Sequence, residues 1–539
     1  MQQLLWDGIP EPRRQGKPGQ VNYFCERPYQ TKARLAIEEG FKEHNSVLVE
    51  LATGLGKTEI FTQVAKDWSA GRCLVIAPYI QLIGQAAKKI YLRTGEQPGI
   101  EQGRNWSVET PWGRSKYVVA SKDSLMSGDP PRYERIKDVG LVVVDEAHLS
   151  ITPKWKELLD YYRSDGAKVL GVTATAKRHD QRAMLNCYDE CVYQYGIKNA
   201  VAEGWLTPAI THCVQLESLD LSGVETSNTV HGRDFRQTQL NALLEKSETI
   251  MEIADITAKE TKDQKTVVYC SSIEEAKLVA ERLVDNYGIK ADWLASDPRR
   301  CTPRHREEAM RSFQEDSGGV THICNVGILT TGWDYPDLRN IVMARPTRSR
   351  ALYTQIFGRG TRPLPGVVDF DGSCPESRRQ AIADSTKPTF RMIDLVDSSL
   401  AHKIVTSADV MSGDLGFDVV ERAKENILES PGAVELDQAM LEAQEQIRKE
   451  REEEERERRK VIEANAKYHT LNVNPFGKNA QGSVVKKKRG AYMTFGKFRG
   501  THVTDVPDWY LKSCMQGKPF IAQAWLRNSI QKELKRRGM

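Results

Sequence analysis

Short apolar runs alternate with stretches of helical periodicity along most of the chain. In the first half these runs are rich in β-branched residues, and most of them end in polar side chains. They cover residues 47–51, 72–78, 117–121, 141–145 and 168–173. Before and between these runs, residues 32–41, 59–68 and 81–92 place apolar side chains at helical spacing. Near-continuous apolar strands separated by helices are typical of a parallel sheet that is covered on both faces.

A second series of apolar runs follows a break in the pattern near residues 204–208. It covers residues 265–272, 291–296, 322–326 and 340–345, with helical segments between them. The pattern therefore predicts an α/β protein with two similar parallel-sheet domains in tandem. Residues 216–236 hold little regular signal, and we expect a connector and a loop there.

The charge pattern divides the rest of the chain. Residues 435–467 are almost without Gly or Pro and include a mixed Glu/Arg run whose i,i+4 pairs favour a solvated helix. A polar linker follows. We therefore predict an N-terminal arm (1–20), a first α/β domain (21–205), a second α/β domain (206–400), a helical charged arm with its linker (401–485) and a small basic C-terminal module (486–539).

Composition indicates a polyanionic partner and argues against a secreted or membrane protein. The 539 residues carry a formal net charge of +4, yet residues 486–539 alone hold 13 Lys/Arg against 3 Asp/Glu. Such a basic tail on a mildly acidic body suits a polyanion. The ten cysteines form no CxxC pair, and no run is long and apolar enough to cross a bilayer. We expect a soluble, cytoplasmic protein.

The segment 51–58, Leu-Ala-Thr-Gly-Leu-Gly-Lys-Thr, has the composition of a phosphate-binding loop between a strand and a helix. Gly54 and Gly56 allow backbone N–H groups to surround an anion, and the helix N-terminus adds partial positive charge. Lys57 can reach the β- and γ-phosphates of a nucleotide, and Thr58 can bind Mg²⁺. The usual first glycine of the pattern is absent, so this motif alone leaves a plain glycine-rich turn as the alternative.

An acidic motif, Asp145-Glu-Ala-His148, follows the apolar run 141–145. Asp145 can hold Mg²⁺ through water opposite Thr58, and Glu146 can orient and deprotonate an attacking water. A pair of acidic residues at a strand end is often an ordinary helix cap. Its order and separation from the phosphate-binding loop favour nucleotide hydrolysis instead.

In its motifs the chain resembles the superfamily 2 helicases and translocases. The resemblance is to the DEAD/DEAH-like ResIII group, which includes the type I restriction motor subunit, phage UvsW-like proteins and bacterial RadD-like proteins. Its elements are a Q motif at 27–30, motif I at 52–58, motif II at 145–148, motif III at 173–175, motif V at 327–334 and motif VI at 355–363. The resemblance implies two tandem RecA-like domains that use ATP and Mg²⁺.

The resemblance also implies roles around the nucleotide. The expected catalytic residues are Lys57, Glu146, Arg359 and Arg362. The two arginines lie one helical turn apart, so both can point across a cleft towards the γ-phosphate. The expected metal ligands are Thr58 and Asp145. The expected nucleotide contacts are Arg27, Gln30, Thr53, Gly54, Leu55, Gly56, Lys57, Thr58, Gly332 and Asp334. The residues expected to couple the nucleotide state to the bound strand are His148, Thr173, Thr175 and Gln355.

Nucleic acid is expected to cross both domains on the side opposite the ATP cleft. By resemblance, the contact candidates are Pro78, Tyr79, Gln81, Ser121, Ser271, Ser272, Thr330 and Thr331. The basic cluster Lys486, Lys487, Lys488 and Arg489 would add attraction for phosphates. Small hydroxyls and backbone amides suit phosphate contacts, so binding should be independent of sequence and strongly dependent on salt. Short Ser/Thr turns also cap helices, which is the alternative role for the serines.

Residues 492–510 resemble a small module that is appended to phage and bacterial nucleic-acid enzymes. Their aromatic side chains Phe495, Phe498, Trp509 and Tyr510 could stack on bases. We favour a small hydrophobic core with a basic surface instead, because aromatic side chains beside turns usually pack.

The sequence therefore predicts an ATP-dependent DNA helicase or translocase that moves on, unwinds or remodels DNA, including branched DNA. We expect sequence-independent binding to single-stranded, duplex or branched DNA, with replication or recombination proteins as partners and no membrane. The compartment would be the cytoplasm of a bacterial or phage-infected cell. Two alternatives stay open: an RNA helicase, and a non-catalytic adaptor that clamps DNA under the control of ATP.

Overall fold

The computed structural model describes residues 26–107, 114–174, 184, 187–229, 232–315, 318–330, 333–370, 374–399, 404–411, 416–430 and 434–472, together with 491, 493, 497–499, 501–515 and 524–538. The chain divides into one unit of residues 1–448 and a second unit of residues 449–539. Each unit has its own hydrophobic core.

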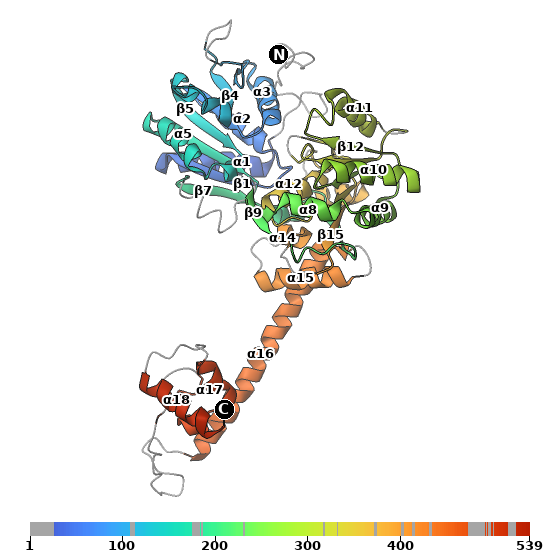
Figure 1. Cartoon of the computed structure of the whole chain (residues 1–539). Coiled ribbons are helices and arrows are strands. Elements are labelled where there is room, and N and C mark those ends of the chain that lie inside the picture. The colour runs from blue at the N-terminus through green and yellow to red at the C-terminus, as the bar shows by residue number, and fades with distance from the viewer. Residues whose placement is uncertain are drawn as a thin grey trace. The chain divides into compact units, whose positions relative to one another are not determined.

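The first unit contains two parallel sheets in two lobes (Figure 1). The first sheet has seven parallel strands in the order β3-β4-β2-β5-β6-β1-β7. The strands are β1 Ser46–Leu51, β2 Arg72–Ala77, β3 Gly99–Glu101, β4 Tyr117–Ser121, β5 Val139–Asp145, β6 Lys168–Thr173 and β7 Glu190–Tyr195. The five strands predicted here are confirmed. The other two escaped prediction because β3 is only three residues long and most of β7 is partly exposed.

Helices cover both faces of the first sheet, because successive side chains of a strand point to opposite sides. Along β1, Val47 and Val49 belong to one hydrophobic cluster and Leu48 to another. The first cluster contains residues of α1, α2 and α3, and the second contains residues of α5. These helices are α1 Pro28–Glu43, α2 Lys57–Asp67, α3 Ile80–Thr94 and α5 Pro153–Ser164.

The second sheet also has seven strands, in the order β12-β13-β11-β14-β15-β8-β16, and all but β16 are parallel. The strands are β8 Ala209–Leu216, β11 Thr266–Tyr269, β12 Ala291–Ala295, β13 His322–Val326, β14 Asn340–Met343, β15 Phe390–Asp397 and β16 Val434–Glu435. The helices α9 and α10 pack on one face, and α11 and α12 on the other. They are α9 Ser247–Thr261, α10 Ile273–Tyr287, α11 Pro303–Gln314 and α12 Arg350–Gly360. The predicted fold class is thus confirmed.

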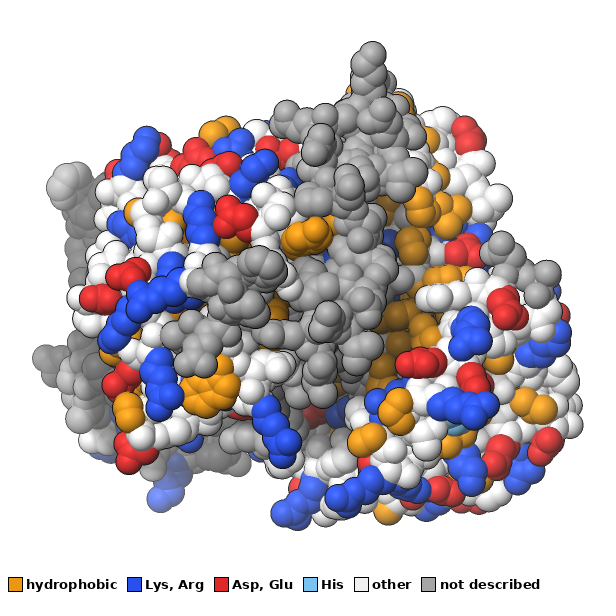
Figure 2. All heavy atoms as spheres, turned by 90° about the horizontal axis from the view of Figure 1, so that it is seen from above, with side chains coloured by type: hydrophobic (Ala, Val, Ile, Leu, Met, Phe, Trp, Pro, Cys, Tyr) orange, Lys and Arg blue, Asp and Glu red, His pale blue; other side chains and the backbone are white. Residues whose placement is uncertain are grey.

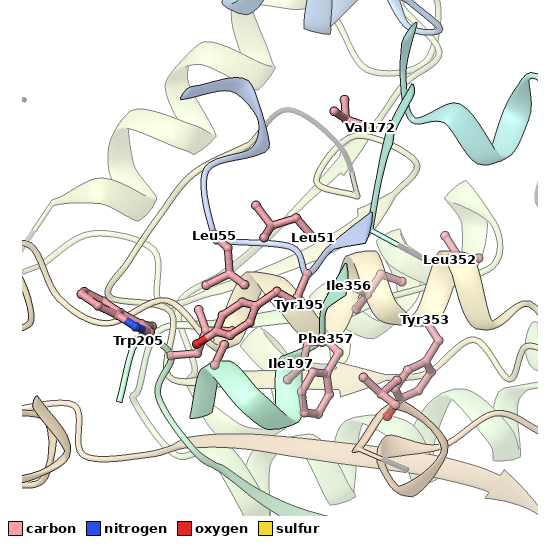
Figure 3. Packing of buried hydrophobic residues seen from close by; sticks show 14 of the residues in the cluster. Leu51, Leu55, Val172, Tyr195, Ile197, Trp205, Leu352, Tyr353, Ile356 and Phe357 are labelled. Atoms are coloured by element: carbon pink, nitrogen blue, oxygen red, sulfur yellow. The ribbon is translucent and has the colours of Figure 1, made fainter. Parts of the chain in front are cut away.

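One hydrophobic cluster runs from the first sheet into the second. Leu51 and Leu55 at the end of β1 gather with Tyr195 of β7 and with Ile356 and Phe357 of α12 (Figure 3). Burial of one such aliphatic or Phe side chain contributes about 1.5–3 kcal/mol. The cluster therefore holds the end of β1 against the second domain, which is consistent with residues 1–448 forming one unit.

Residues 216–236 are not the irregular connector expected from the sequence. β9 (Thr226–Thr229) and β10 (Gly232–Phe235) form an antiparallel hairpin, and α8 (Gln237–Leu244) follows. Buried Asp234 fixes the hairpin, since it accepts from Thr347 Oγ1 at 2.7 Å and from the Arg348 N–H at 2.8 Å. The prediction was wrong because these two short strands, Thr-Ser-Asn-Thr and Gly-Arg-Asp-Phe, are mostly polar and form no apolar run.

The described residues 404–411, 416–430 and 434–443, which we assigned to the charged arm, pack on the second sheet. Apolar residues of α14 (Ser407–Met411) and α15 (Phe417–Glu429) belong to its core, and β16 pairs antiparallel with β8. The helix predicted at 435–467 is confirmed as α16 (Leu436–Asn472). Its first turns bury Leu436, Met440 and Ala443. α13 (Pro375–Asp384) lies between α12 and β15 in sequence.

The second unit contains the small C-terminal module. Its described elements include α17 (Asp508–Met515) and α18 (Ala524–Arg536), whose apolar residues share one hydrophobic cluster. Tyr510 is 7% exposed within this core, whereas Trp509 is 59% exposed. Phe498 packs against the core, and Phe495 lies outside the described residues. Among the helices that the structure describes in the whole chain, none combines the length and apolar character needed to span a membrane.

Candidate functional site

The loop between β1 and α2 has the geometry of a phosphate-binding loop. Gly54 and Gly56 have φ angles of +90° and +80°, in the left-handed region that side chains rarely adopt. Because α2 begins at Lys57, the N–H groups of Lys57 and Thr58 have no acceptor within the helix and can bind an anion, whereas those of Glu59 and Ile60 donate to the Gly56 carbonyl. A Cβ on Gly56 would lie 2.7 Å from Gln30 Nε2, so the turn also requires glycine for close packing.

Gln30 supports this loop through its buried amide. Its Nε2 donates to the Leu55 carbonyl at 3.0 Å, and its Oε1 accepts from the Arg27 N–H at 3.0 Å. Tyr29 Oη donates to the same Leu55 carbonyl at 3.0 Å. Arg27 makes two hydrogen bonds of 2.9 Å to the carboxylate of Asp369 in the second domain. The amide of Gln30 is thus engaged at both ends by protein, and its expected contact with the nucleotide stays a prediction.

Asp145 and Glu146 lie at the end of β5, close to Lys57. Glu146 Oε1 is 3.8 Å from Lys57 Nζ, and both side chains are 11% exposed. Glu146 has a φ of +51°, a strained value for a residue with a Cβ, and its N–H donates to Asp145 Oδ1 at 3.0 Å. Burial, together with the charge of Glu146, raises the pKa of Asp145 to about 7. Two buried carboxylates beside one lysine favour a further cation.

The oxygen ligands at this position fit Mg²⁺. This ion prefers oxygen, keeps several waters, and is usually held by one or two carboxylates together with nucleotide phosphates. Asp145 would supply the carboxylate and Thr58, in the first turn of α2, the hydroxyl. The assignment of these two residues as metal ligands stays a prediction.

His148 connects the acidic motif to the neighbouring strand. Its Nδ1 lies 3.1 Å from Thr173 Oγ1 at the end of β6 and 3.5 Å from Glu146 Oε2. Two of the expected coupling residues therefore contact one another beside Glu146, and Thr175 lies outside the described residues. Gln355 is 3% exposed in α12, and neither atom of its amide group has a hydrogen-bond partner within the described chain. Such a group costs about 1–3 kcal/mol unless a ligand satisfies it.

Arg359 and Arg362 are held by the loop that follows β13. Arg359 donates to the Thr330 carbonyl at 2.7 and 3.2 Å and also to the Trp333 carbonyl. Arg362 donates to the Trp333 carbonyl at 3.2 Å and to the Asp334 carboxylate. Burial, with repulsion from Arg362, lowers the pKa of Arg359 to about 10, which still leaves it charged at neutral pH. The loop therefore fixes both guanidinium groups in position.

A cavity of about 540 Å³ lies between the two domains. Its volume is within the range of pockets that bind small molecules. Most of the expected nucleotide residues line it, namely Arg27, Thr53, Gly54, Gly56, Lys57, Thr58, Asp145, Glu146, Asp334, Arg359 and Arg362. Leu55 and Gln30 do not line it, and Gly332 lies outside the described residues. The structure thus brings residues from both domains around one cavity.

Two further walls of the cavity were missed by the sequence analysis. One is a face of α3, which contributes Leu82, Gln85, Lys88, Lys89, Leu92 and Arg93. The other is residues 363–369, of which Pro363, Leu364, Pro365, Val368 and Asp369 line the cavity. Apart from Pro363, the last residue of motif VI, no motif includes these side chains, because they reach the cavity only through the folding of the domain.

Gly358 and Lys387 also position the arginine helix. A Cβ on Gly358 would lie 2.3 Å from the Cβ of Thr53, so only glycine lets α12 approach the phosphate-binding loop this closely. Lys387 is 1% exposed, and its Nζ donates to the carbonyls of Pro336 and Arg362 at 2.6 and 2.8 Å. Burial lowers the pKa of Lys387 to about 7. Gly358 lies inside motif VI, whereas no pattern in the sequence marks Lys387.

Two of the serines expected to contact nucleic acid, Ser121 and Ser272, cap helices, and the hydroxyl of the third, Ser271, donates to a side chain within the protein. Ser121 Oγ accepts from the Ser124 N–H at 3.2 Å, and Ser272 Oγ accepts from the Glu275 N–H at 3.0 Å. Ser271 Oγ lies 2.8 Å from a Glu275 oxygen. All three serines are less than one tenth exposed. Capping, the alternative considered for these residues, is therefore present, and their contact with nucleic acid stays a prediction.

The other expected nucleic-acid residues are only partly described. Pro78 and Tyr79 follow β2 and are half-buried. Burial, with the charge of Glu146 adding to it, raises the pKa of Tyr79 to about 12. Thr330 uses its carbonyl to hold Arg359. The side chain of Gln81 and all of Thr331, Lys486, Lys487, Lys488 and Arg489 lie outside the described residues.

Two parallel-sheet domains that form opposite walls of one cavity, with a phosphate-binding loop on one wall, are the architecture of a tandem RecA-like protein. Residues 24–178 match the family "Type III restriction enzyme, res subunit" (ResIII), and residues 245–363 match the family "Helicase conserved C-terminal domain". Over these two segments the chain is similar to the ResIII group of superfamily 2 DEAD/DEAH-like helicases.

Two similar proteins are named as an ATP-dependent helicase and as a restriction endonuclease subunit. The chain is 29% identical over 363 residues to the "Putative ATP-dependent helicase IRC3" of Saccharomyces cerevisiae, covering 63% of this chain and 50% of that protein. It is 24% identical over 376 residues to the "Type I restriction enzyme EcoAI endonuclease subunit" of Escherichia coli, covering 62% and 44%. The chain spans about half the length of these relatives.

One solved structure to which the chain is similar is the "ATP-dependent Type ISP restriction-modification enzyme LlaBIII bound to DNA". It is 16% identical, with a TM-score of 0.49, over 71% of this chain and 28% of the other.

Proposed function

We propose that this protein is an ATP-dependent helicase or translocase that acts on DNA. The observation that carries the proposal is the cavity, whose walls combine Lys57 and Glu146 of the first domain with Arg359 and Arg362 of the second. A nucleotide in this cavity would contact both domains, so its hydrolysis would change how tightly they close. The similarity to a yeast protein named as an ATP-dependent helicase and to restriction endonuclease subunits supports the same class.

In this proposal the residues of the first domain bind the phosphates and activate water. The Lys57 side chain and the N–H groups of Lys57 and Thr58 hold the β- and γ-phosphates. Thr58 and Asp145 would hold Mg²⁺, which supplies charge neutralisation to the phosphates when it is bound. Glu146, 3.8 Å from Lys57, orients the attacking water and accepts its proton.

Arg359 and Arg362 stabilise the negative charge that develops on the transferred phosphoryl group. Their hydrogen bonds to the loop after β13 fix both side chains before the reaction, so little reorganisation is needed when the charge forms. Because they belong to the second domain, hydrolysis requires that domain to approach the phosphate-binding loop. This requirement couples the chemistry to movement along the nucleic acid.

We propose DNA as the substrate and, more specifically, branched DNA. The support for this is the restriction subunits among the relatives and the basic composition of residues 486–539. We propose that binding is independent of sequence and falls steeply with salt, as expected of phosphate contacts. An RNA substrate and an adaptor without hydrolysis are the alternatives.

The test is a comparison of ATP hydrolysis and unwinding on single-stranded DNA, duplexes, forks, four-way junctions and RNA of equal length. We expect DNA to stimulate hydrolysis by the wild-type protein. Lys57→Ala and Glu146→Gln should each lower the turnover at least about a hundredfold while DNA binding persists, because each removes a group acting directly on phosphate or water.

Each alternative gives a distinct result in the same panel. Stimulation by RNA above that by DNA would replace DNA with RNA as the substrate. Absence of nucleic-acid-stimulated hydrolysis in the wild-type protein would leave the adaptor, and wild-type turnover by Lys57→Ala would contradict the assigned site. A variant that ends before Lys486, tested for DNA affinity and its salt dependence, addresses the basic module, and unchanged values would exclude a role for it in binding.

A further inference from the structure

The loop after β3 holds an exposed tryptophan in a fixed position. Trp106 is 40% exposed, although large hydrophobic side chains of the first sheet are otherwise mostly buried. The guanidinium carbon of Arg132 lies 3.8 Å from its ring centroid, and that of Arg135 lies 5.1 Å away. Contacts of this kind between a cation and an aromatic face are worth about a twofold to thirtyfold effect on an equilibrium.

Arg132 is buried and is held by an ion pair and by hydrogen bonds to two backbone carbonyls. It is 5% exposed, pairs with the buried carboxylate of Glu101, and donates to the carbonyls of Gly103 and Asn105 at 2.7 and 2.6 Å. The other oxygen of Glu101 accepts from the N–H and Oγ of Ser107 at 2.9 and 2.7 Å. This network fixes residues 101–107 on both sides of Trp106.

A tight turn within the same loop presents a second basic side chain. Gln102 and Asn105 bond to one another through their backbones at 2.8 and 3.2 Å, which leaves Arg104 exposed at the tip. Within the described chain, no ion-pair partner is recorded for Arg104 or Arg135. Glu101, the acidic side chain bonded to this loop, is buried and paired with Arg132, whereas Arg104 and Arg135 are exposed and add positive charge near Trp106.

The loop lies at the edge of the sheet that carries the expected nucleic-acid residues. β3 and β4 are parallel neighbours, so their carboxyl ends meet at the same edge. The Gly103 N–H donates to Ser124 Oγ at 2.8 Å, and Ser124 Oγ accepts from Ser121 Oγ at 2.8 Å. Ser121, at the end of β4, is one of those expected contacts. Hydrogen bonds through Ser124 thus connect the loop of residues 101–107, which holds Trp106, to Ser121.

We propose that Trp106, with Arg104 and Arg135, is a contact for single-stranded nucleic acid, in which a base stacks on the indole ring and the two arginines attract adjacent phosphates. An aromatic ring held open beside cations is the arrangement that binds single strands without reading their sequence. The partner is identified by charge as well as by the ring, because two exposed arginines beside an aromatic ring suit the phosphates and bases of a single strand. Figure 2 shows Lys and Arg side chains interspersed with acidic ones on the face it displays.

The inference rests on the proposed function, so the test uses the full-length protein and two probes. One is a labelled oligothymidylate of about 16 nucleotides, and the other is an abasic strand of the same length. Trp106→Ala should weaken binding of oligothymidylate about 5- to 100-fold, the range seen for loss of one base–aromatic stack. The same variant should bind the abasic strand as the wild type does, because only the base contact is lost.

Three controls separate stacking from structure. Trp106→Phe should recover part of the affinity for oligothymidylate. Arg104→Ala should weaken both probes and lower the slope of affinity against salt by about one ion. Tyr287→Ala, which removes a comparably exposed aromatic ring (43%) on α10, should bind both probes like the wild type.

Failure of this inference differs from failure of the proposed function. If the wild-type protein binds neither probe, the proposed nucleic-acid function fails. If the wild type binds and Trp106→Ala matches it on both probes, only the contact at Trp106 fails. Equal losses on the two probes would show that Trp106 supports the fold of the loop instead of stacking on a base, and would also overturn the inference.

Discussion

Gly358→Ala tests whether close approach of the two domains is needed for hydrolysis. The added Cβ would lie 2.3 Å from Thr53 Cβ and 2.7 Å from Thr53 Cγ2, whereas ordinary contacts begin at 3.4 Å. α12 and the phosphate-binding loop must therefore separate by about 1.1 Å, the difference between 3.4 and 2.3 Å. The substitution lies in a helix interior, where alanine is favoured over glycine by about 1 kcal/mol. The helix itself is thus expected to tolerate the change.

The magnitude follows from the position of the clash. Overpacking of this size costs about 1–3 kcal/mol, part of which the better helix propensity offsets. Arg359 follows Gly358 directly, so the shift moves its guanidinium group away from the γ-phosphate site. A misplacement of about 1 Å in a reacting geometry lowers the rate about a hundredfold. We expect kcat for DNA-stimulated ATP hydrolysis to fall by about that factor, with little change in the melting temperature.

The assay measures kcat, the KM for ATP and the thermal midpoint of the wild type, Gly358→Ala and Gly223→Ala. Gly223→Ala is the matched control, because its Cβ would meet nothing within 4 Å and its φ is not left-handed. A kcat for Gly358→Ala equal to that of the wild type, with the protein folded, would refute the argument that the two domains must approach this closely. A large fall in the thermal midpoint would instead assign the effect to stability.

Two further predictions concern other links between the domains and the buried charge of the second domain. Asp369→Asn removes the ion pair between Asp369 (47% exposed) and Arg27 (21% exposed). Such a pair is worth at most about 1 kcal/mol, so the KM for ATP should rise no more than about fivefold with kcat unchanged. A fall in kcat alone would contradict this. Burial raises the pKa of Glu275 to about 7, so the folded state keeps this proton to higher pH than the unfolded chain does, and the free energy of unfolding should fall as pH rises from about 4.5 to about 7. Glu275→Gln should remove that slope and be more stable than the wild type at pH 8 by up to about 3 kcal/mol in chemical denaturation, while identical pH profiles would refute the assignment.

The strands and the phosphate-binding loop could be predicted because their signals are local. A strand buried on both faces must be apolar along its length, so residues 141–145 and 168–173 stand out without any knowledge of the fold. The strands β9 and β10 could not be found in this way, since their residues, Thr-Ser-Asn-Thr and Gly-Arg-Asp-Phe, are mostly polar, and β16 has only two residues. For the same reason residues 404–448 looked like an arm, although β16 pairs with β8 across more than 200 positions.

The serines show the limit of motifs as evidence for roles. Ser121, Ser271 and Ser272 stand where the resemblance expects nucleic-acid contacts, yet the structure uses their hydroxyls within the protein. A sequence gives the residue type at a strand end, but the acceptor that a hydroxyl finds depends on which helix starts there. Trp106 shows the opposite case, because no motif includes it and only its exposure and its two arginines single it out.

The sequence by itself determined the two parallel-sheet domains, the glycine loop with Lys57, the acidic pair and the arginine helix, since each depends on neighbouring residues in the chain. Tertiary structure alone decided that these groups surround one cavity, that Gly358 meets Thr53, and that Asp369 reaches Arg27. The physical reason is distance along the chain: contacts between residues some 300 positions apart depend on how two domains dock, and no local pattern of side chains records that.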